Sequence, residues 1–81
     1  MNRRRIRLKN CPIGLFLFNH ELCVKTEYED NNGTIKAYIV SSGEHFWGGV
    51  STGSEQRELL VHPVPLNMLR IAKTAFDEII D

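Results

Sequence analysis

The amino-acid sequence predicts an α+β fold, in which a small antiparallel sheet of four to five strands in meander order carries one C-terminal helix packed on a face. Three observations lead to this prediction. Short β-prone runs alternate with turn sequences up to about residue 64. Apolar side chains in residues 65–81 recur with a helical period. A chain of 81 residues is of a size typical of one domain, spanning residues 1–81.

The first hairpin is predicted from "GLFLF" and "ELCVKTEY", which flank Asn19 and His20. A two-residue loop at Asn19 and His20 fixes the register of the two strands. The facing pairs expected are Leu15 with Val24, Phe16 with Cys23, Leu17 with Leu22, and Phe18 with Glu21. Both faces of this hairpin are then apolar. We therefore expect it to be central in the sheet, or covered on both sides.

Turn residues predict the next two strands. In "EDNNGT", Asn32 and Gly33 suit a type I′ turn, and a strand over residues 35–41 follows it. "SSGEHFWGG" indicates another turn and a short fourth strand carrying His45, Phe46 and Trp47, which Gly48 and Gly49 end or bulge.

The last part of the chain contains two helical patterns separated by a proline-bearing strand. "STGSEQRELL" suits one or two helical turns with Thr52 or Ser54 as N-cap. "LVHPV" is expected to be an edge strand, because prolines lack an N–H to donate. Residues 65–81 are expected to form a helix whose apolar stripe packs on the sheet. The stripe consists of Leu66, Leu69, Ala72, Phe76, Ile79 and Ile80. The charged side contains Arg70, Lys73, Asp77 and Asp81.

The net charge is zero, but its distribution is uneven. Residues 1–9 contain no acid, and their five cations are Arg3, Arg4, Arg5, Arg7 and Lys9. The remaining residues are acidic in sum. One interpretation is a first strand with Ile6 and Leu8 turned inward and the cations outside. The other is a basic arm that contacts phosphates directly and binds nucleic acid without sequence preference.

Catalytic, metal and cofactor sites are not expected. The spacing of cysteines, serines and histidines matches no nucleophile, phosphate-loop or zinc motif. Glu44 and His45 are adjacent on a predicted strand and would point to opposite faces. Cys11 and Cys23 form no C-x-x-C pair, and their offset in the hairpin exceeds disulfide reach, so two free thiols are expected. No apolar run is long enough for a membrane span and the start lacks a secretory pattern, which predicts a cytoplasmic protein.

The single tryptophan raises a question of burial, because glycines and serines surround it. Trp47 could plug one end of the sheet, with Gly48 and Gly49 letting the chain pass over its ring. Alternatively, Phe46 and Trp47 point to opposite faces, and one ring stands out as an anchor for a partner. Acids at the strand ends would then surround that ring and favour a basic partner. The predicted partner-binding residues are Glu27, Glu29, Asp30, Glu44, His45, Phe46 and Trp47.

The segments "CPIGLFLFNHELCVKTEY", "AYIVSSGEHFWGG" and "RELLVHPV" resemble small accessory proteins encoded by phages and prophages. The resemblance spans about residues 11–65 and carries over no catalytic or ligand residue. It implies a non-enzymatic inhibitor that binds and blocks a host protein or nucleoprotein complex, such as a CRISPR effector, in the manner of anti-CRISPR proteins. The alternative is a nucleic-acid-binding accessory protein that acts through the basic N-terminal arm. A homodimer through the strand at residues 60–64 is a further expectation.

Overall fold

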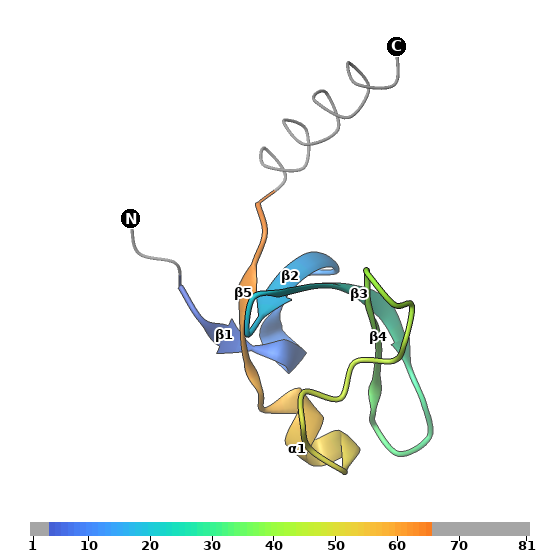
Figure 1. The fold of residues 1–81 in the computed structure, drawn as a ribbon. Helices are drawn as coiled ribbons and strands as arrows, with labels where there is room; N and C mark the ends of the chain where they lie inside the picture. Colours follow the sequence, from blue (N-terminus) through green and yellow to red (C-terminus); the bar gives the residue numbers. More distant parts are fainter. Residues whose placement is uncertain (1–3, 66–81) are drawn as a thin grey trace.

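A computed structural model of the chain describes residues 4–65. The predicted helix over residues 65–81 therefore lies outside the described residues, apart from Pro65. The described elements follow one another from the N-terminal strand to β5 (Figure 1). They are β1 (Ile6–Arg7), the 3-10 helix η1 (Leu8–Asn10), β2 (Gly14–Phe18), β3 (Glu21–Glu29), β4 (Ile35–Ile39), α1 (Gly53–Arg57) and β5 (Leu60–Pro63).

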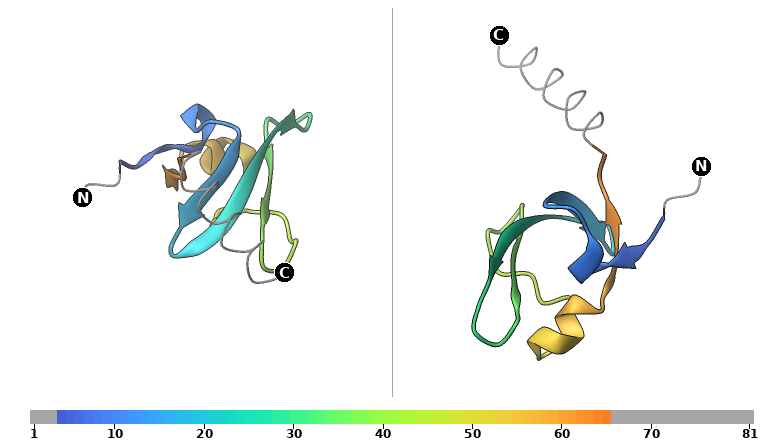
Figure 2. Two further views of the ribbon diagram at one scale, coloured as in Figure 1. Left: turned by 90° about the horizontal axis from the view of Figure 1, so that it is seen from above. Right: turned by 180° about the vertical axis from the view of Figure 1, so that it is seen from behind.

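The five strands form one antiparallel sheet in the order β1-β5-β2-β3-β4. The α+β class and the antiparallel sheet are as predicted, but the meander order is correct only for β2, β3 and β4. The sheet arches from β1 and β5 to β4, and α1 lies between the two ends of the arch (Figure 1). Two further views show the same curvature from above and from behind (Figure 2).

The prediction that β5 is an edge strand is wrong. Leu60 and Val61 pair with β1, whereas His62 and Pro63 pair with β2, so β5 has neighbours on both sides. Val64 N donates to Leu15 O at 3.0 Å. In an antiparallel pair, hydrogen-bonded and non-hydrogen-bonded positions alternate, so the adjacent Pro63 is a non-hydrogen-bonded position on the β2 side. Proline is therefore tolerated there, because no N–H is needed to bond to β2. The edge that was expected to pair with a second copy is therefore occupied within the chain.

The β2–β3 hairpin confirms the predicted register at all four facing pairs. Asn19 and His20 both have positive φ, 48° and 68°, as a two-residue turn between right-twisted strands requires. A core face and an outer face follow from this register. Phe16 and Cys23 point into the interior, and their strand neighbours point outward.

The β3–β4 turn differs from the predicted type I′ geometry, because only Gly33 has a positive φ, at 78°. Gly33 N donates to Asp30 O at 3.0 Å, which closes a turn with Asn31 and Asn32 at its centre. Asp30 favours this turn, since its Oδ1 accepts from Asn32 N at 2.9 Å and Thr34 N at 3.0 Å. Strand β4 also ends at Ile39, two residues before the predicted boundary.

The strand interpretation of the N-terminal segment is correct only for Ile6 and Arg7, which form β1, because Leu8 already begins η1. Leu8 is fully buried and Ile6 packs against the core, while Arg5, Arg7 and Lys9 are exposed. The interior beneath the sheet combines side chains from both ends of the chain. It contains Leu8, Cys11, Phe16, Cys23, Ile35, Ala37, Phe46 and Val61.

The predicted short helical segment is confirmed as α1. Thr52 is its N-cap, and Thr52 Oγ1 accepts from Glu55 N at 3.2 Å. The predicted fourth strand over His45, Phe46 and Trp47 is reduced to an isolated bridge between Tyr38 and His45. Gly48 and Gly49 both have positive φ, 63° and 84°, and this turns the chain away from β4 before a full strand can form.

Candidate functional site

The structure places Phe46 and Trp47 on opposite sides of the chain. Phe46 is 2% exposed and makes edge-to-face contacts with Phe16 and Phe18, each with ring centroids 5.2 Å apart. Trp47 is 39% exposed. The interpretation of Trp47 as a plug is therefore wrong, because the backbone that places Phe46 in the core turns its neighbour outward. Trp47 is left as the exposed ring.

Three aromatic rings form what we call the aromatic strip: Tyr38, His45 and Trp47. The Tyr38 and His45 rings meet edge to face, with centroids 5.7 Å apart. The His45 and Trp47 rings are tilted by 51°, with centroids 5.0 Å apart. The His45 ring is held in place by the backbone of β4, since its Nε2 lies 3.2 Å from Ile35 O. The indole is therefore supported by a neighbouring ring that is itself anchored to the backbone.

The aromatic strip continues an apolar surface on the outer side of β2, β3 and β4. We call this surface the outer face and define it by Leu15, Leu17, Leu22, Val24, Tyr38 and Val40. The register places Leu15, Val24 and Tyr38 in one row and Leu17 and Leu22 in the next. Val40 extends that second row, because its N donates to Leu22 O at 3.0 Å. Exposure reaches 36% at Leu22 and 51% at Val40, so the surface is accessible.

Gly48 explains why glycine follows the two aromatic residues. A Cβ at this position would press into the Leu59 side chain and come within 3.0 Å of Phe46 Cζ. The chain therefore passes directly over the buried rings. The ring beneath the glycine belongs to Phe46 and not, as the plug interpretation assumed, to Trp47.

The predicted acidic residues do not form a single rim around Trp47. Glu29 lies opposite Ile35, at the end of the β3–β4 pair that leads into the Asp30 turn. Glu44 lies at the other end, where its carbonyl accepts from Ile39 N at 2.8 Å. The loop after β4 reverses the chain and carries Glu44 to that end. Glu27 is exposed on β3.

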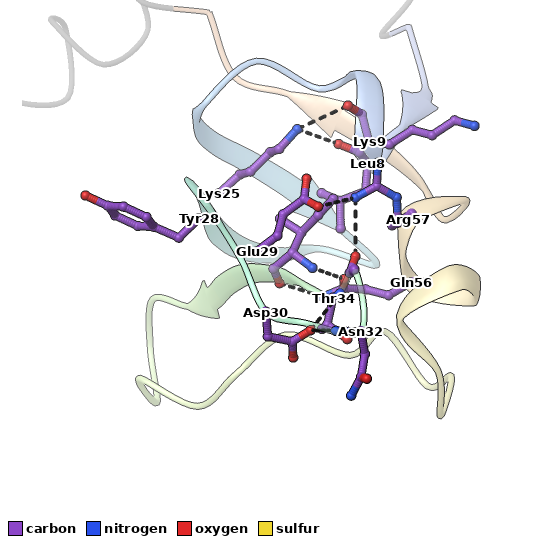
Figure 3. Close-up of polar contacts among 12 residues, drawn as sticks. Leu8, Lys9, Lys25, Tyr28, Glu29, Asp30, Asn32, Thr34, Gln56 and Arg57 are labelled. Atoms are coloured by element: carbon purple, nitrogen blue, oxygen red, sulfur yellow. Dashed lines mark hydrogen bonds and ion pairs between the residues drawn. The ribbon is translucent and has the colours of Figure 1, made fainter.

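Two of the predicted acids have structural partners (Figure 3). Glu29 Oε1 lies 3.0 Å from the guanidinium of Arg57. Asp30 accepts two backbone N–H groups in its turn, and the hydrogen bond from Thr34 is the main cause that lowers the pKa of its carboxyl below the ordinary value. Their carboxylates are therefore already engaged by groups of this chain. Of the predicted set, the structure brings the His45 and Trp47 rings together at the surface, whereas Phe46 lies in the core.

The basic N-terminal segment is partly neutralised. Arg7 Nε and Lys9 Nζ each lie 2.8 Å from an oxygen of the Glu58 carboxylate. Contacts from Lys9, and then from Arg7, lower the pKa of Glu58 and keep it ionised. Arg4 and Arg5 are exposed, and Arg3 lies outside the described residues.

Sequence reasoning missed the burial of two long polar side chains, Gln56 and Lys25. Gln56 is fully buried, and its amide holds the backbone of Ile35 and Phe46: Oε1 accepts from Ile35 N at 2.8 Å, and Nε2 donates to Ile35 O and Phe46 O. No signal in the polar run "SEQR" marks Gln56 as buried. This amide fixes the segment that presents Trp47.

Lys25 is the second, and Figure 3 shows its ammonium group directed at the carbonyls of the η1 region. Lys25 Nζ donates to Leu8 O at 2.8 Å and Cys11 O at 2.6 Å. Burial lowers the pKa of this amine below its ordinary value. The two-residue period from Cys23 would have placed Lys25 on the core face, so a signal for its burial was present.

An open hollow and two buried thiols in residues 4–65 bear on the question of catalysis. An open hollow of about 350 Å³ lies between the β2–β3 turn and residues 46–49, with Phe18, Ile39 and Phe46 among its lining and Glu21 as its one carboxylate. Cys11 and Cys23 are buried free thiols, as predicted. Among these described residues, no cluster of three metal-ligating side chains occurs. No helix in the described part of the chain has the length and apolar character to span a bilayer.

Comparison with protein-family models, curated proteins and solved structures finds no match for this chain.

Proposed function

We propose that this protein is a non-enzymatic inhibitor that binds and blocks a host protein or nucleoprotein complex, with Trp47 as the central anchor. The observation that carries the proposal is the contrast between Phe46, at 2% exposure, and Trp47, at 39%. An aromatic ring held outside the core by ring contacts loses little conformational freedom when a partner covers it. Tryptophan is also among the residues that dominate interface energetics.

The surroundings of Trp47 favour protein recognition over chemistry. His45 and Tyr38 support the indole on one side, and the outer face extends the apolar surface beyond them. Such a surface suits an apolar patch on a partner. The resemblance to phage accessory proteins supplies the expected setting, in which the partner is a bacterial defence complex such as a CRISPR effector.

Affinity capture from a bacterial lysate, followed by an activity assay of the captured complex, tests this proposal. We expect Trp47→Ala to weaken capture by at least about 30-fold, the effect of losing an anchor of roughly 2 kcal/mol. The matched control is Tyr28→Ala, which removes another exposed ring that lies outside the aromatic strip. Both variants should keep the thermal unfolding midpoint of the unsubstituted protein. Equal capture by both variants, or a captured complex whose activity is unchanged, would contradict the proposal.

A second candidate function is nucleic-acid binding through the N-terminal segment. The observation in its favour is that Arg4 and Arg5 are exposed. Arg7 and Lys9 share the Glu58 carboxylate, which reduces the charge available to phosphates. If this candidate is correct, Glu58→Gln should strengthen a DNA or RNA gel shift and steepen its salt dependence, whereas replacing Arg4 and Arg5 by Glu should abolish it.

A further inference from the structure

Glu21 is an acidic residue that the strand register places on the core side of the sheet. It faces Phe18 in the closing pair of the β2–β3 hairpin, and directly opposed residues point to the same side. It also precedes the buried Cys23 by two residues, which is the period of one face of a strand. In agreement, burial and then the Glu21 charge raise the pKa of the Cys23 thiol to about 11. Glu21 itself is exposed, so its carboxylate lies at the open end of the core.

The Glu21 carboxylate has no cationic partner among residues 4–65. The three ion pairs in this part of the chain engage Glu29 and Glu58, and none of them reaches Glu21. The one hydrogen bond that the described residues make to its side chain comes from Ser41 Oγ, at the long distance of 3.4 Å. An ionised carboxylate has about four lone-pair sites. Most of its capacity to accept hydrogen bonds is therefore open to a partner.

The hollow next to this carboxylate is lined mainly by apolar side chains and by backbone. Phe18 and Ile39 contribute apolar side chains, while Gly48 and Gly49 contribute backbone without a Cβ. The volume of the hollow is about 350 Å³, which lies near the lower limit for sites that take a small ligand. A group that fits here needs an apolar stem to lie against the Phe18 ring and a positive charge to meet Glu21.

We propose that this hollow is a binding site for an arginine side chain of a protein partner. A guanidinium group pairs with a carboxylate through two parallel hydrogen bonds and stacks on aromatic rings, and Glu21 and Phe18 supply both contacts in one hollow. Lysine suits it less, because its ammonium group is more strongly hydrated. Gly48 directly follows Trp47, so the arginine would enter beside the proposed anchor. That the arginine comes from the blocked host protein rests on the proposed function, whereas the affinity of the hollow for such a side chain does not.

A nuclear magnetic resonance titration of the full chain with acetyl-arginine amide tests the hollow directly. The matched probe is acetyl-citrulline amide, which has a side chain of similar shape and no charge. We expect the arginine compound to give saturable shifts of the Ile39 methyl and Phe18 ring resonances, and to bind at least about 3-fold more tightly than the citrulline compound. Glu21→Gln should remove this difference. The control Glu27→Gln, which neutralises an exposed carboxylate on the same strand but outside the hollow, should retain it.

The Val61 methyl resonances, in the core, report whether each variant stays folded. Equal affinities for the two compounds would overturn the proposal. Equal losses in Glu21→Gln and Glu27→Gln would overturn it as well, because they would show only an effect of net charge.

The same titration separates this site from the proposed function. Selective arginine binding by a protein that captures nothing from lysate would support the hollow and contradict the proposed function. Capture through Trp47 without selective arginine binding would support the proposed function and overturn the hollow.

Discussion

Replacing Gln56 by leucine should detach α1 from the sheet. The leucine keeps similar bulk but removes the amide that pairs with Ile35 and Phe46. Ile35 O keeps a contact to His45 Nε2 at 3.2 Å, so two backbone groups lose their partners: Ile35 N–H and Phe46 C=O. At roughly 1–3 kcal/mol for each buried group left unpaired, the expected loss is about 2–6 kcal/mol.

That loss is a large fraction of the total for a domain of this size, for which unfolding free energies of about 5–15 kcal/mol are usual. Urea unfolding followed by the fluorescence of Trp47 measures it, because the only tryptophan lies one residue from the affected Phe46. The control is Ser54→Ala, an exposed change in the same helix. A Gln56→Leu variant that loses less than about 1 kcal/mol would refute the idea that this amide holds the helix.

Gln56→Glu refines the same test through pH. The carboxylate keeps an acceptor for Ile35 N–H but directs a second oxygen at the carbonyls that Nε2 now contacts. Burial should raise the pKa of this new carboxyl in the folded state. Its protonated form restores a donor, so the stability of the variant should rise as pH falls from 7 towards 4 and be lost as pH rises through the folded pKa.

Three further predictions concern the glycine turn, a buried thiol and the buried amine. Gly48→Ala should lower the thermal unfolding midpoint more than Gly49→Ala. Both substitutions place alanine at a positive φ, but only the Cβ at position 48 would collide with Leu59. Equal losses in thermal unfolding would contradict this. Burial, and then Glu21, raises the pKa of the Cys23 thiol from 9.0 to about 11. The unfolding free energy should therefore fall by up to about 2.7 kcal/mol as the pH rises from 9 to 11. Urea titrations of Cys23→Ala should show a smaller fall. Lys25→Met should cost about 1–3 kcal/mol in urea unfolding, because carbonyls of the η1 region lose their donor, and an unchanged midpoint would exclude that role.

Local patterns were sufficient for the elements that depend on neighbours in the chain. The two-residue turn at Asn19 and His20 specified the β2–β3 register. Once the loop length of a hairpin is known, the residue that faces each strand position is known too. The Thr52 cap and the burial of Leu8 followed from equally local signals. The exposed position of Trp47 was one of two alternatives. Adjacent side chains point to opposite sides of an extended chain, so the burial of Phe46 decides that Trp47 points outward.

The sequence by itself determined the first hairpin and the capped α1, because each depends on residues a few positions apart. The α+β class and the free thiols followed from the pattern of strands and from the offset of the two cysteines in the hairpin. Only the tertiary structure decided that β5 lies between β1 and β2, that Glu29 and Glu44 lie at different ends of the β3–β4 pair, and that Gln56 is buried. These features depend on which distant segments meet. Strand order and the sharing of a buried amide are settled by packing, and no local spacing along the chain encodes them.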